Sequence, residues 1–246
     1  TGSWNTAVGH EAGKAMTTGV DNTAIGLSAG AAITSGTRNV AIGGVALDNA
    51  DGENDNLAIG YAALGGAVNG GEYNVAIGNY SMDALTTADE NTAVGYNAMT
   101  GATSGFNNTA LGKDAMESLT QGSHNVAIGN DAGDAIASGQ QNVVIGSGAD
   151  VNDEAAINQI VIGYDVDGHG NNIAVIGNTD MTAWHPADDG GVDLGSSSYE
   201  FKDLYVDGVA YVDGLDLNGT TVSATAAELN IMDGVTATAT ELNLID

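Results

Sequence analysis

The chain repeats a short phrase of polar and apolar positions, in which Asn is followed by a variable residue, Ala, a large aliphatic and Gly. At 125–129 it reads NVAIG. The step between closing glycines is 17 residues, with one exception of 18 between Gly60 and Gly78. Looser copies end at Gly163 and, after 14 residues, at Gly177. A fixed period of this length is typical of a solenoid.

The first half of each repeat predicts a strand, because its side chains alternate between two faces and both are apolar. We expect the large aliphatic to fill the interior of its own coil. The alanine then faces outward, where small residues in register let a symmetry-related copy of the chain approach. The residues expected at this trimer contact are Ala7, Ala24, Ala41, Ala58, Ala76, Ala93, Ala110 and Ala127.

The second half of the repeat carries apolar residues three and four positions apart, as in Ala12, Ala15 and Met16. This spacing favours one short helical turn over a second strand. The Asn and Gly of the phrase are expected to set the turns of the coil, and stacked Asn side chains can form an amide ladder. The turn residues singled out are Asn22, Asn39, Asn56, Gly26, Gly43 and Gly60.

The predicted fold is therefore mainly β, a parallel β-solenoid that forms a homotrimeric fibre. Residues 1–177 form the repeat shaft, 178–222 a strand-rich connector, and 223–246 the start of a second, shorter repeat. The chain begins and ends inside a repeat pattern, which indicates a piece of a longer protein. Eleven coils stacked at the strand spacing would make a rod on the order of 50 Å long.

The charge of the chain limits its partners. It carries 32 Asp plus Glu against four Lys plus Arg, a formal net charge of −28. Nucleic acid is excluded as a partner, because binding phosphates needs clustered basic residues. The absence of an 18-residue apolar run predicts no membrane insertion. The lack of cysteine means that packing and oligomerisation, rather than disulfides, must stabilise the fold.

One acidic stretch has the residue types of a calcium site. Residues 165–172 read DVDGHGNN, but His169 and Ile176 stand where an EF-hand needs oxygen ligands, so that motif is excluded. A looser Ca²⁺ site built from Asp165, Asp167 and Asn171 is weighed against a solvated acidic turn. We expect no cofactor other than such loosely bound Ca²⁺. No convergent carboxylate pair or catalytic triad stands out, so an enzyme, such as a polysaccharide depolymerase, is the least favoured class.

The repeated phrase over residues 5–177 resembles the head repeats of trimeric autotransporter adhesins and, in its longer form, repeats of bacteriophage tail fibres. LGSSSYEFKDLYVDG at 194–208 and TAAELNIMDGVTATATELNLID at 225–246 are similar to tail-fibre segments. The resemblance implies a non-enzymatic homotrimer in the virion that contacts other tail proteins and a glycan or protein of the host surface. The alternative is the head of a bacterial adhesin at the cell surface.

Overall fold

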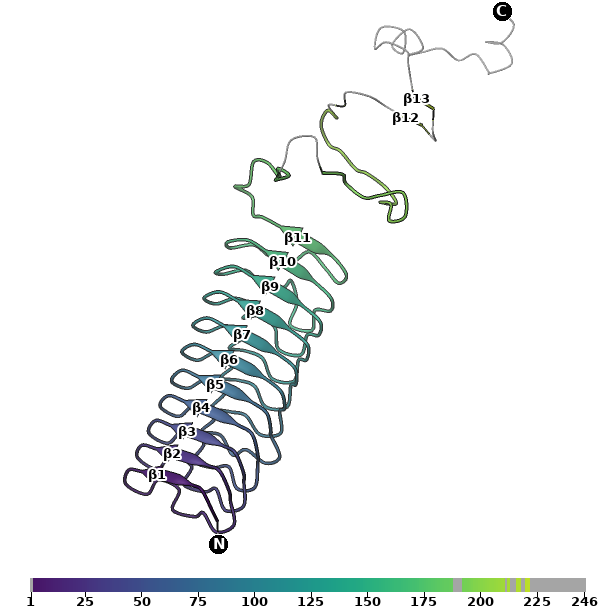
Figure 1. Cartoon of the computed structure of the whole chain (residues 1–246). Helices are drawn as coiled ribbons and strands as arrows, with labels where there is room; N and C mark the ends of the chain where they lie inside the picture. Colours follow the sequence, from purple (N-terminus) through teal and green to yellow (C-terminus); the bar gives the residue numbers. More distant parts are fainter. Residues whose placement is uncertain (1, 188–191, 211, 213–215, 218–219, 222–246) are drawn as a thin grey trace, which may run out of the picture. The chain divides into compact units, whose positions relative to one another are not determined.

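A computed structural model describes residues 2–187, 192–210, 212, 216–217 and 220–221 of the chain (Figure 1). The chain divides into two compact units, Thr1–Trp184 and His185–Asp246, which are described separately. The predicted second repeat at 223–246 lies outside the described residues.

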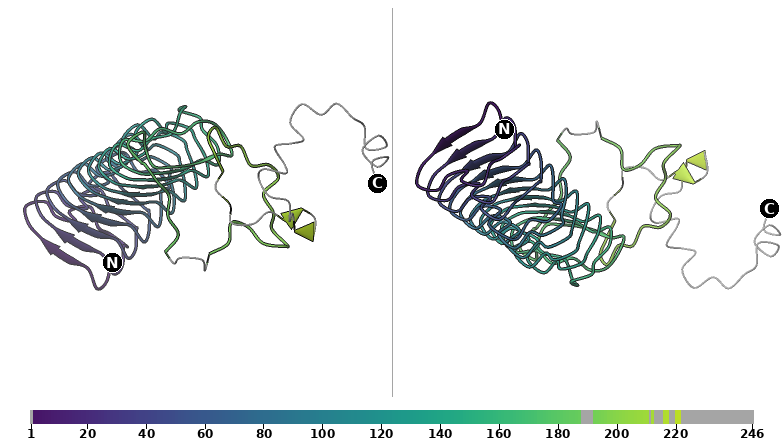
Figure 2. Two further views of the ribbon diagram at one scale, coloured as in Figure 1. Left: turned by 90° about the horizontal axis from the view of Figure 1, so that it is seen from above. Right: turned by 90° about the horizontal axis from the view of Figure 1, so that it is seen from below.

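The first unit is a parallel β-solenoid in which each coil contributes one three-residue strand to a single sheet. The eleven strands pair in sequence order, so every coil lies between its neighbours along the chain (Figures 1 and 2). The strands are β1 Thr6–Val8, β2 Thr23–Ile25, β3 Val40–Ile42, β4 Leu57–Ile59, β5 Val75–Ile77, β6 Thr92–Val94, β7 Thr109–Leu111, β8 Val126–Ile128, β9 Val143–Ile145, β10 Ile160–Ile162 and β11 Ala174–Ile176. The predicted β-solenoid is confirmed.

The glycine that closes the phrase is required by the stacking of the coils. Gly43 adopts a φ of 135°, a conformation that L side chains rarely take. A Cβ atom at this position would lie 2.2 Å from the carbonyl oxygen of Gly60 in the next coil. The backbones of successive coils therefore meet at a distance that only glycine permits.

The Asn of the phrase forms the expected amide ladder. The amide oxygen of Asn22 accepts the backbone N–H of Asn39 at 2.9 Å. The Nδ2 of Asn39 donates to the carbonyl oxygen of Glu53 at 2.7 Å, across the turn of its own coil. Equivalent bonds recur in each repeat up to Asn142, whose oxygen accepts the N–H of Gln159 at 2.9 Å. Because these Asn side chains are buried, the ladder supplies partners that water does not.

The prediction that the strand alanines face a neighbouring chain is wrong. Seven of them, Ala24, Ala41, Ala58, Ala76, Ala93, Ala110 and Ala127, are fully buried within this one chain, and Ala7 in the first coil is exposed. The backbone of the opposite wall of the coil lies close to them. A Cβ atom built on Gly133 would lie 3.2 Å from the Cβ of Ala127 and 3.1 Å from the Cδ1 of Ile136. Beside Ala127 the coil interior is therefore narrow, whereas Val144 and Val161 occupy the same strand position in the next two coils and are also fully buried.

The predicted helical turn in the second half of each repeat is also wrong, because the described residues include no helix. This half is a series of turns in which residues such as Val45 and Leu47 adopt positive φ angles of 51° and 48°. The N–H of Leu47 donates to the carbonyl oxygen of Ala63 in the next coil at 3.0 Å. Bonds between coils therefore replace the i to i−4 bonds of a helix, although the apolar spacing is the same.

The wall opposite the sheet fills the coil with the side chains of two positions, three residues apart in most coils. Where the first position is Gly30, the second is Ile33, and a Cβ on Gly30 would lie 2.9 Å from the Cδ1 of Ile33. Where the first position is Leu47, the second is Ala50, and both are buried. In other coils both positions are large: Met82 accompanies Leu85 and Met116 accompanies Leu119, and all four side chains are fully buried. The interior of the stack is therefore filled by different pairs of side chains in different coils.

In the second unit, the described residues hold two short strands, β12 Asp216–Leu217 and β13 Thr220–Thr221. They pair antiparallel, with Asp216 opposite Thr221. Ser196 and Tyr199 exchange two backbone hydrogen bonds, which closes a turn. This unit overlaps the connector predicted over 178–222.

Candidate functional surfaces

The outer face of the sheet is an uncharged strip in which one row is entirely aliphatic and the other also contains threonines. We define this outer strip as the first and third residues of strands β1 to β11. The first row is Thr6, Thr23, Val40, Leu57, Val75, Thr92, Thr109, Val126, Val143, Ile160 and Ala174. The second row is Val8, Ile25, Ile42, Ile59, Ile77, Val94, Leu111, Ile128, Ile145, Ile162 and Ile176. Neither row contains a charged residue.

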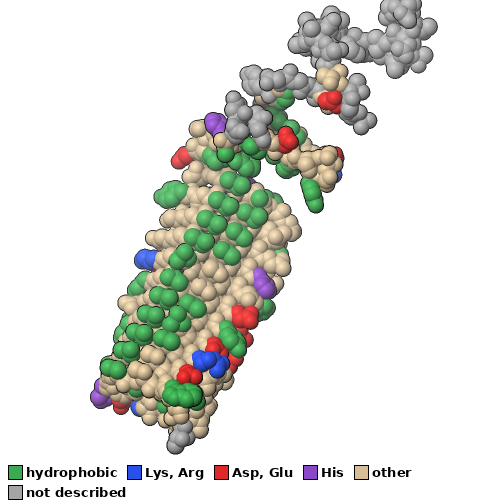
Figure 3. Space-filling view, in the orientation of Figure 1, with side chains coloured by type: hydrophobic (Ala, Val, Ile, Leu, Met, Phe, Trp, Pro, Cys, Tyr) green, Lys and Arg blue, Asp and Glu red, His purple; other side chains and the backbone are tan. Residues whose placement is uncertain are grey.

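The side chains of the outer strip remain accessible to solvent in the single chain. Leu111 is 47% exposed and Ile25 38%, whereas Ala110 and Ala24 beside them are fully buried. Figure 3 shows hydrophobic side chains in rows that follow the stack of coils. The sequence indicated that both faces of the strand are apolar, but the interior and exterior assignments were reversed. In β2 to β10 the middle residue is never larger than its two neighbours, being Ala in β2 to β8 and Val in β9 and β10, and it is the residue enclosed in the coil.

A row of tyrosines follows the carboxyl ends of three strands. The ring centroids of Tyr61 and Tyr80 lie 5.5 Å apart, and those of Tyr80 and Tyr96 lie 5.9 Å apart, both edge to face. The three side chains are between 36% and 51% exposed. Tyr61 directly follows Gly60 at the end of β4, so the row extends the apolar surface beyond the sheet.

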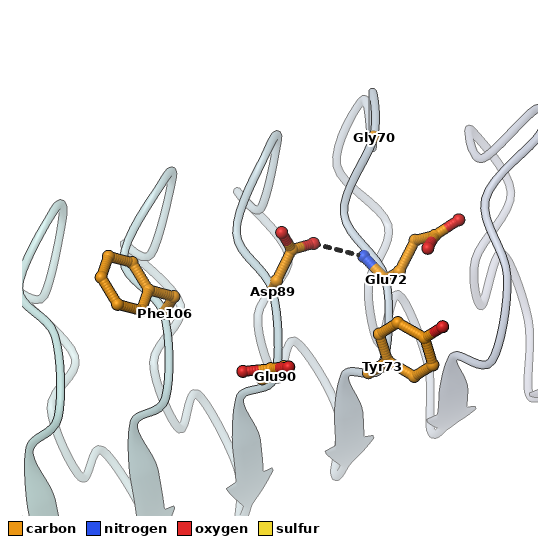
Figure 4. A pocket seen from close by; sticks show the side chains of 6 residues that line it. All are labelled: Gly70, Glu72, Tyr73, Asp89, Glu90 and Phe106. Carbon is orange, nitrogen blue, oxygen red and sulfur yellow. Dashed lines mark hydrogen bonds between the residues drawn. The ribbon is translucent and has the colours of Figure 1, made fainter.

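A groove of about 240 Å³ lies on the turns that precede β5, β6 and β7 (Figure 4). It is lined by Gly70, Glu72, Tyr73, Asp89, Glu90 and Phe106, which come from three successive coils. The side chains of Tyr73, Glu90 and Phe106 are exposed, and those of Glu72 and Asp89 are half-buried. The groove therefore combines three carboxylates with two aromatic rings, an arrangement that the sequence analysis did not anticipate.

The 18-residue coil forms one end of this groove. Gly70 adopts a φ of 102° and a Cβ atom there would meet nothing within 4 Å. The buried carboxylate of Glu53, in the previous coil, accepts the N–H of Gly70 at 2.9 Å and that of Asp51 at 2.7 Å. Glu53 thus holds the longer loop in place while leaving its rim open to solvent.

The three residues weighed as a calcium site lie near the last coils. Asp165 and Asp167 line a groove of about 340 Å³ together with His169. The amide oxygen of Asn171 accepts the N–H of Ile157 at 2.8 Å, and Asn171 is not among the residues lining that groove. Within the described ranges, no three His, Cys, Asp or Glu side chains are grouped so that they could hold a metal ion.

The surroundings of Asp150 raise the pKa of its carboxyl group strongly. It is half-buried, and burial raises its pKa to about 6, although the N–H groups of Ala135 and Val151 donate to it at 2.8 and 2.7 Å. The nearby negative charges of Asp134 and Asp167 contribute a smaller part of this raised pKa. The charge of Asp150 therefore changes at mildly acidic pH.

Each of the four basic side chains of the chain forms an ion pair with a carboxylate of the same chain. Lys14 pairs with Glu11 at 2.8 Å, Arg38 with Asp55 at 2.6 Å and Lys202 with Asp203 at 3.3 Å, and Lys113 contacts Asp114. These pairs neutralise few of the 32 acidic residues. The remaining carboxylates give the surface a negative potential that favours cations.

No protein-family model, curated protein or solved structure matches this chain. In the part of the chain that the structure describes, no helix has the length and apolar character needed to cross a bilayer.

Proposed function

We propose that this chain is a structural, non-enzymatic segment of a homotrimeric fibre that presents a virion to the surface of its host. The observation that carries the proposal is the outer strip on a stack of eleven coils. A stack of this kind bridges a distance without needing a catalytic centre, and its uncharged face offers a place for chains to associate.

The size of the outer strip supports association. Eleven strands of three residues make a strip about 50 Å long and about 10 Å wide, on the order of 500 Å². The largest apolar patch on an ordinary monomer is 300–600 Å², and patches of that size commonly mark an interaction site. The tyrosine row Tyr61, Tyr80 and Tyr96 adds further apolar area beside it.

The periodicity of the strip favours a second copy of the chain as the partner. The second row of the strip consists of Val, Ile and Leu at the spacing of the coils, and another copy has the same spacing along its whole length. The net charge of −28 opposes association elsewhere on the surface, whereas the outer strip brings no like charges together. The assignment to a trimer, and to a tail fibre, rests on the resemblance of the repeats and of residues 194–208 and 225–246 to tail-fibre segments.

Light scattering coupled to size-exclusion chromatography tests the proposal. The chain should elute with the mass of a trimer, and the double variant Ile59→Lys and Ile77→Lys should shift it to a monomer with an unchanged circular dichroism spectrum. Both residues are half-buried on the outer strip. Ser104→Lys, at an exposed turn position, is the matched control and should leave the mass unchanged. A stable monomer of the unmodified chain would overturn the trimer.

A further inference from the structure

We propose that the groove between Tyr73 and Phe106 binds a small organic cation, an alkylammonium group, with Glu90 as its counter-ion. This inference does not depend on the association of chains, because the groove lies on the turns before the strands and shares no residue with the outer strip.

The carboxylates of the groove differ in the hydrogen bonds that they accept. Asp89 accepts the backbone N–H of Glu72 at 2.7 Å, which is the bond drawn in Figure 4. Glu72 accepts the Nδ2 of Asn54 at 2.5 Å. Within the described part of the chain, the carboxylate of Glu90 accepts no hydrogen bond. Glu90 is therefore the carboxylate of the groove with both oxygens open to a donor from outside the chain.

A neighbouring pair of coils forms an ion pair at the repeat position that Glu90 occupies. Arg38, Asp55, Tyr73 and Glu90 each occupy the position directly before the ladder Asn of successive coils. The Nε and Nη2 of Arg38 donate to the two carboxylate oxygens of Asp55, both at 2.6 Å. The same stacking leaves Glu90 between Tyr73 and Asn107, neither of which is a cation. An external cation at Glu90 would restore the pairing that Arg38 and Asp55 make within the chain.

The aromatic side chains favour an organic cation over a metal ion. Tyr73 and Phe106 are 56% and 46% exposed and lie at opposite ends of the groove (Figure 4). Aromatic faces attract alkylammonium groups through the ring quadrupole and also contact their methyl or methylene groups. A hard metal ion instead needs several convergent oxygens, and the described side chains offer no such group of three acidic or histidine residues.

The volume of the groove agrees with a ligand of this size. At about 240 Å³ it is smaller than the pockets of about 300–1,000 Å³ that enclose drug-sized ligands. A single ammonium-bearing side chain or a molecule the size of choline fits this volume. The acidic surface around the groove raises the local concentration of such a cation.

Calorimetric titration of the whole chain with choline chloride, against sodium chloride at equal ionic strength, tests the proposal. Choline should bind saturably at one site per chain. Phe106→Ala should lower the affinity by about 2- to 30-fold, since a cation–π contact contributes about 0.5–2 kcal/mol. Glu90→Gln should lower it by up to about 5-fold, since an exposed ion pair contributes up to about 1 kcal/mol. Glu154→Gln removes the same charge at another exposed position and should leave the affinity unchanged.

Three outcomes would overturn the proposal. In the first, choline gives no more heat than sodium, which would mean counter-ion uptake only. In the second, Glu154→Gln weakens binding as much as Glu90→Gln. In the third, calcium chloride binds the groove instead, with an affinity that depends on Glu90 but not on Phe106. Circular dichroism of each variant checks that the coils are intact. We expect an unchanged spectrum, because Glu90, Phe106 and Glu154 are exposed and lie outside the core.

Discussion

The amide oxygen of Asn91 accepts two hydrogen bonds from Asn108, one coil further along the chain. The backbone N–H lies 2.9 Å and the Nδ2 3.1 Å from that oxygen. The Nδ2 of Asn91 in turn donates to the carbonyl oxygen of Gly105 at 2.9 Å. One buried side chain therefore joins two coils and also holds the turn of its own coil.

Replacing this side chain should destabilise the stack. Asn91→Ala leaves the N–H of Asn108 and the carbonyl of Gly105 without partners in a buried environment. Each such loss costs about 1–3 kcal/mol, so we expect the free energy of unfolding to fall by about 2–6 kcal/mol. Urea denaturation measures the change. Asn130→Ala is the control: its side chain is exposed, and a change below about 0.5 kcal/mol is expected. Equal effects at both sites would contradict the role of the ladder.

The closing glycines should not accept even a methyl group. Gly43→Ala would place a Cβ 2.2 Å from the carbonyl oxygen of Gly60 and impose a strained φ of 135°. We expect a loss of at least about 2 kcal/mol, because the coils must separate locally. Thermal unfolding monitored by circular dichroism measures it. At the adjacent Gly44 a Cβ would meet only the ring of Tyr61 at 3.3 Å, so Gly44→Ala should be far milder. A neutral Gly43→Ala would show that the coils stack less closely than described.

Ala93 and Thr92 distinguish the two faces of one strand. Ala93 is fully buried, whereas Thr92 is half-buried on the outer strip. Ala93→Leu should destabilise the coil by about 1–3 kcal/mol through overpacking, in monomeric and associated chains alike. Thr92→Leu should leave the unfolding of the monomer nearly unchanged. Denaturation of both variants in the Ile59→Lys and Ile77→Lys background, where association is removed, measures this difference. The reverse order of effects would restore the original assignment of the alanines to a chain contact.

Asp150 should make stability depend on pH in a defined direction. Its pKa is raised from 3.8 to about 6 in the folded chain. Between about pH 4 and pH 6 the folded state therefore holds a proton that the unfolded state releases. This contribution to the free energy of unfolding is present at the acidic end and is lost as the pH rises through 6. Because the group is partly solvated, we expect only about 1–2 kcal/mol.

The Asp150→Asn variant isolates this effect. The difference in unfolding free energy between the original chain and the variant should change by about 1–2 kcal/mol from pH 4 to pH 7. Asp153→Asn, at a neighbouring exposed carboxylate, serves as the control and should show no comparable dependence. A difference that stays constant over this range would mean that Asp150 titrates near its ordinary value.

The sequence alone determined the solenoid, its coil length and the recurrence of Asn39 and Gly43 at one place in each coil. These follow from spacing, because a residue that recurs every 17 positions must occupy the same place in every coil. The direction of the strand faces could not be obtained this way. Alternation separates Ala93 from Thr92 and Val94, but it does not say which side is enclosed.

Only the tertiary structure decided that question, because the distance between the two walls of the coil sets the size of the enclosed residue. It also decided that the second half of the repeat is a set of turns, since bonds such as Leu47 to Ala63 join different coils. The groove at Tyr73, Glu90 and Phe106 is likewise invisible in the sequence. Its residues are up to 36 positions apart and meet only because the coils stack.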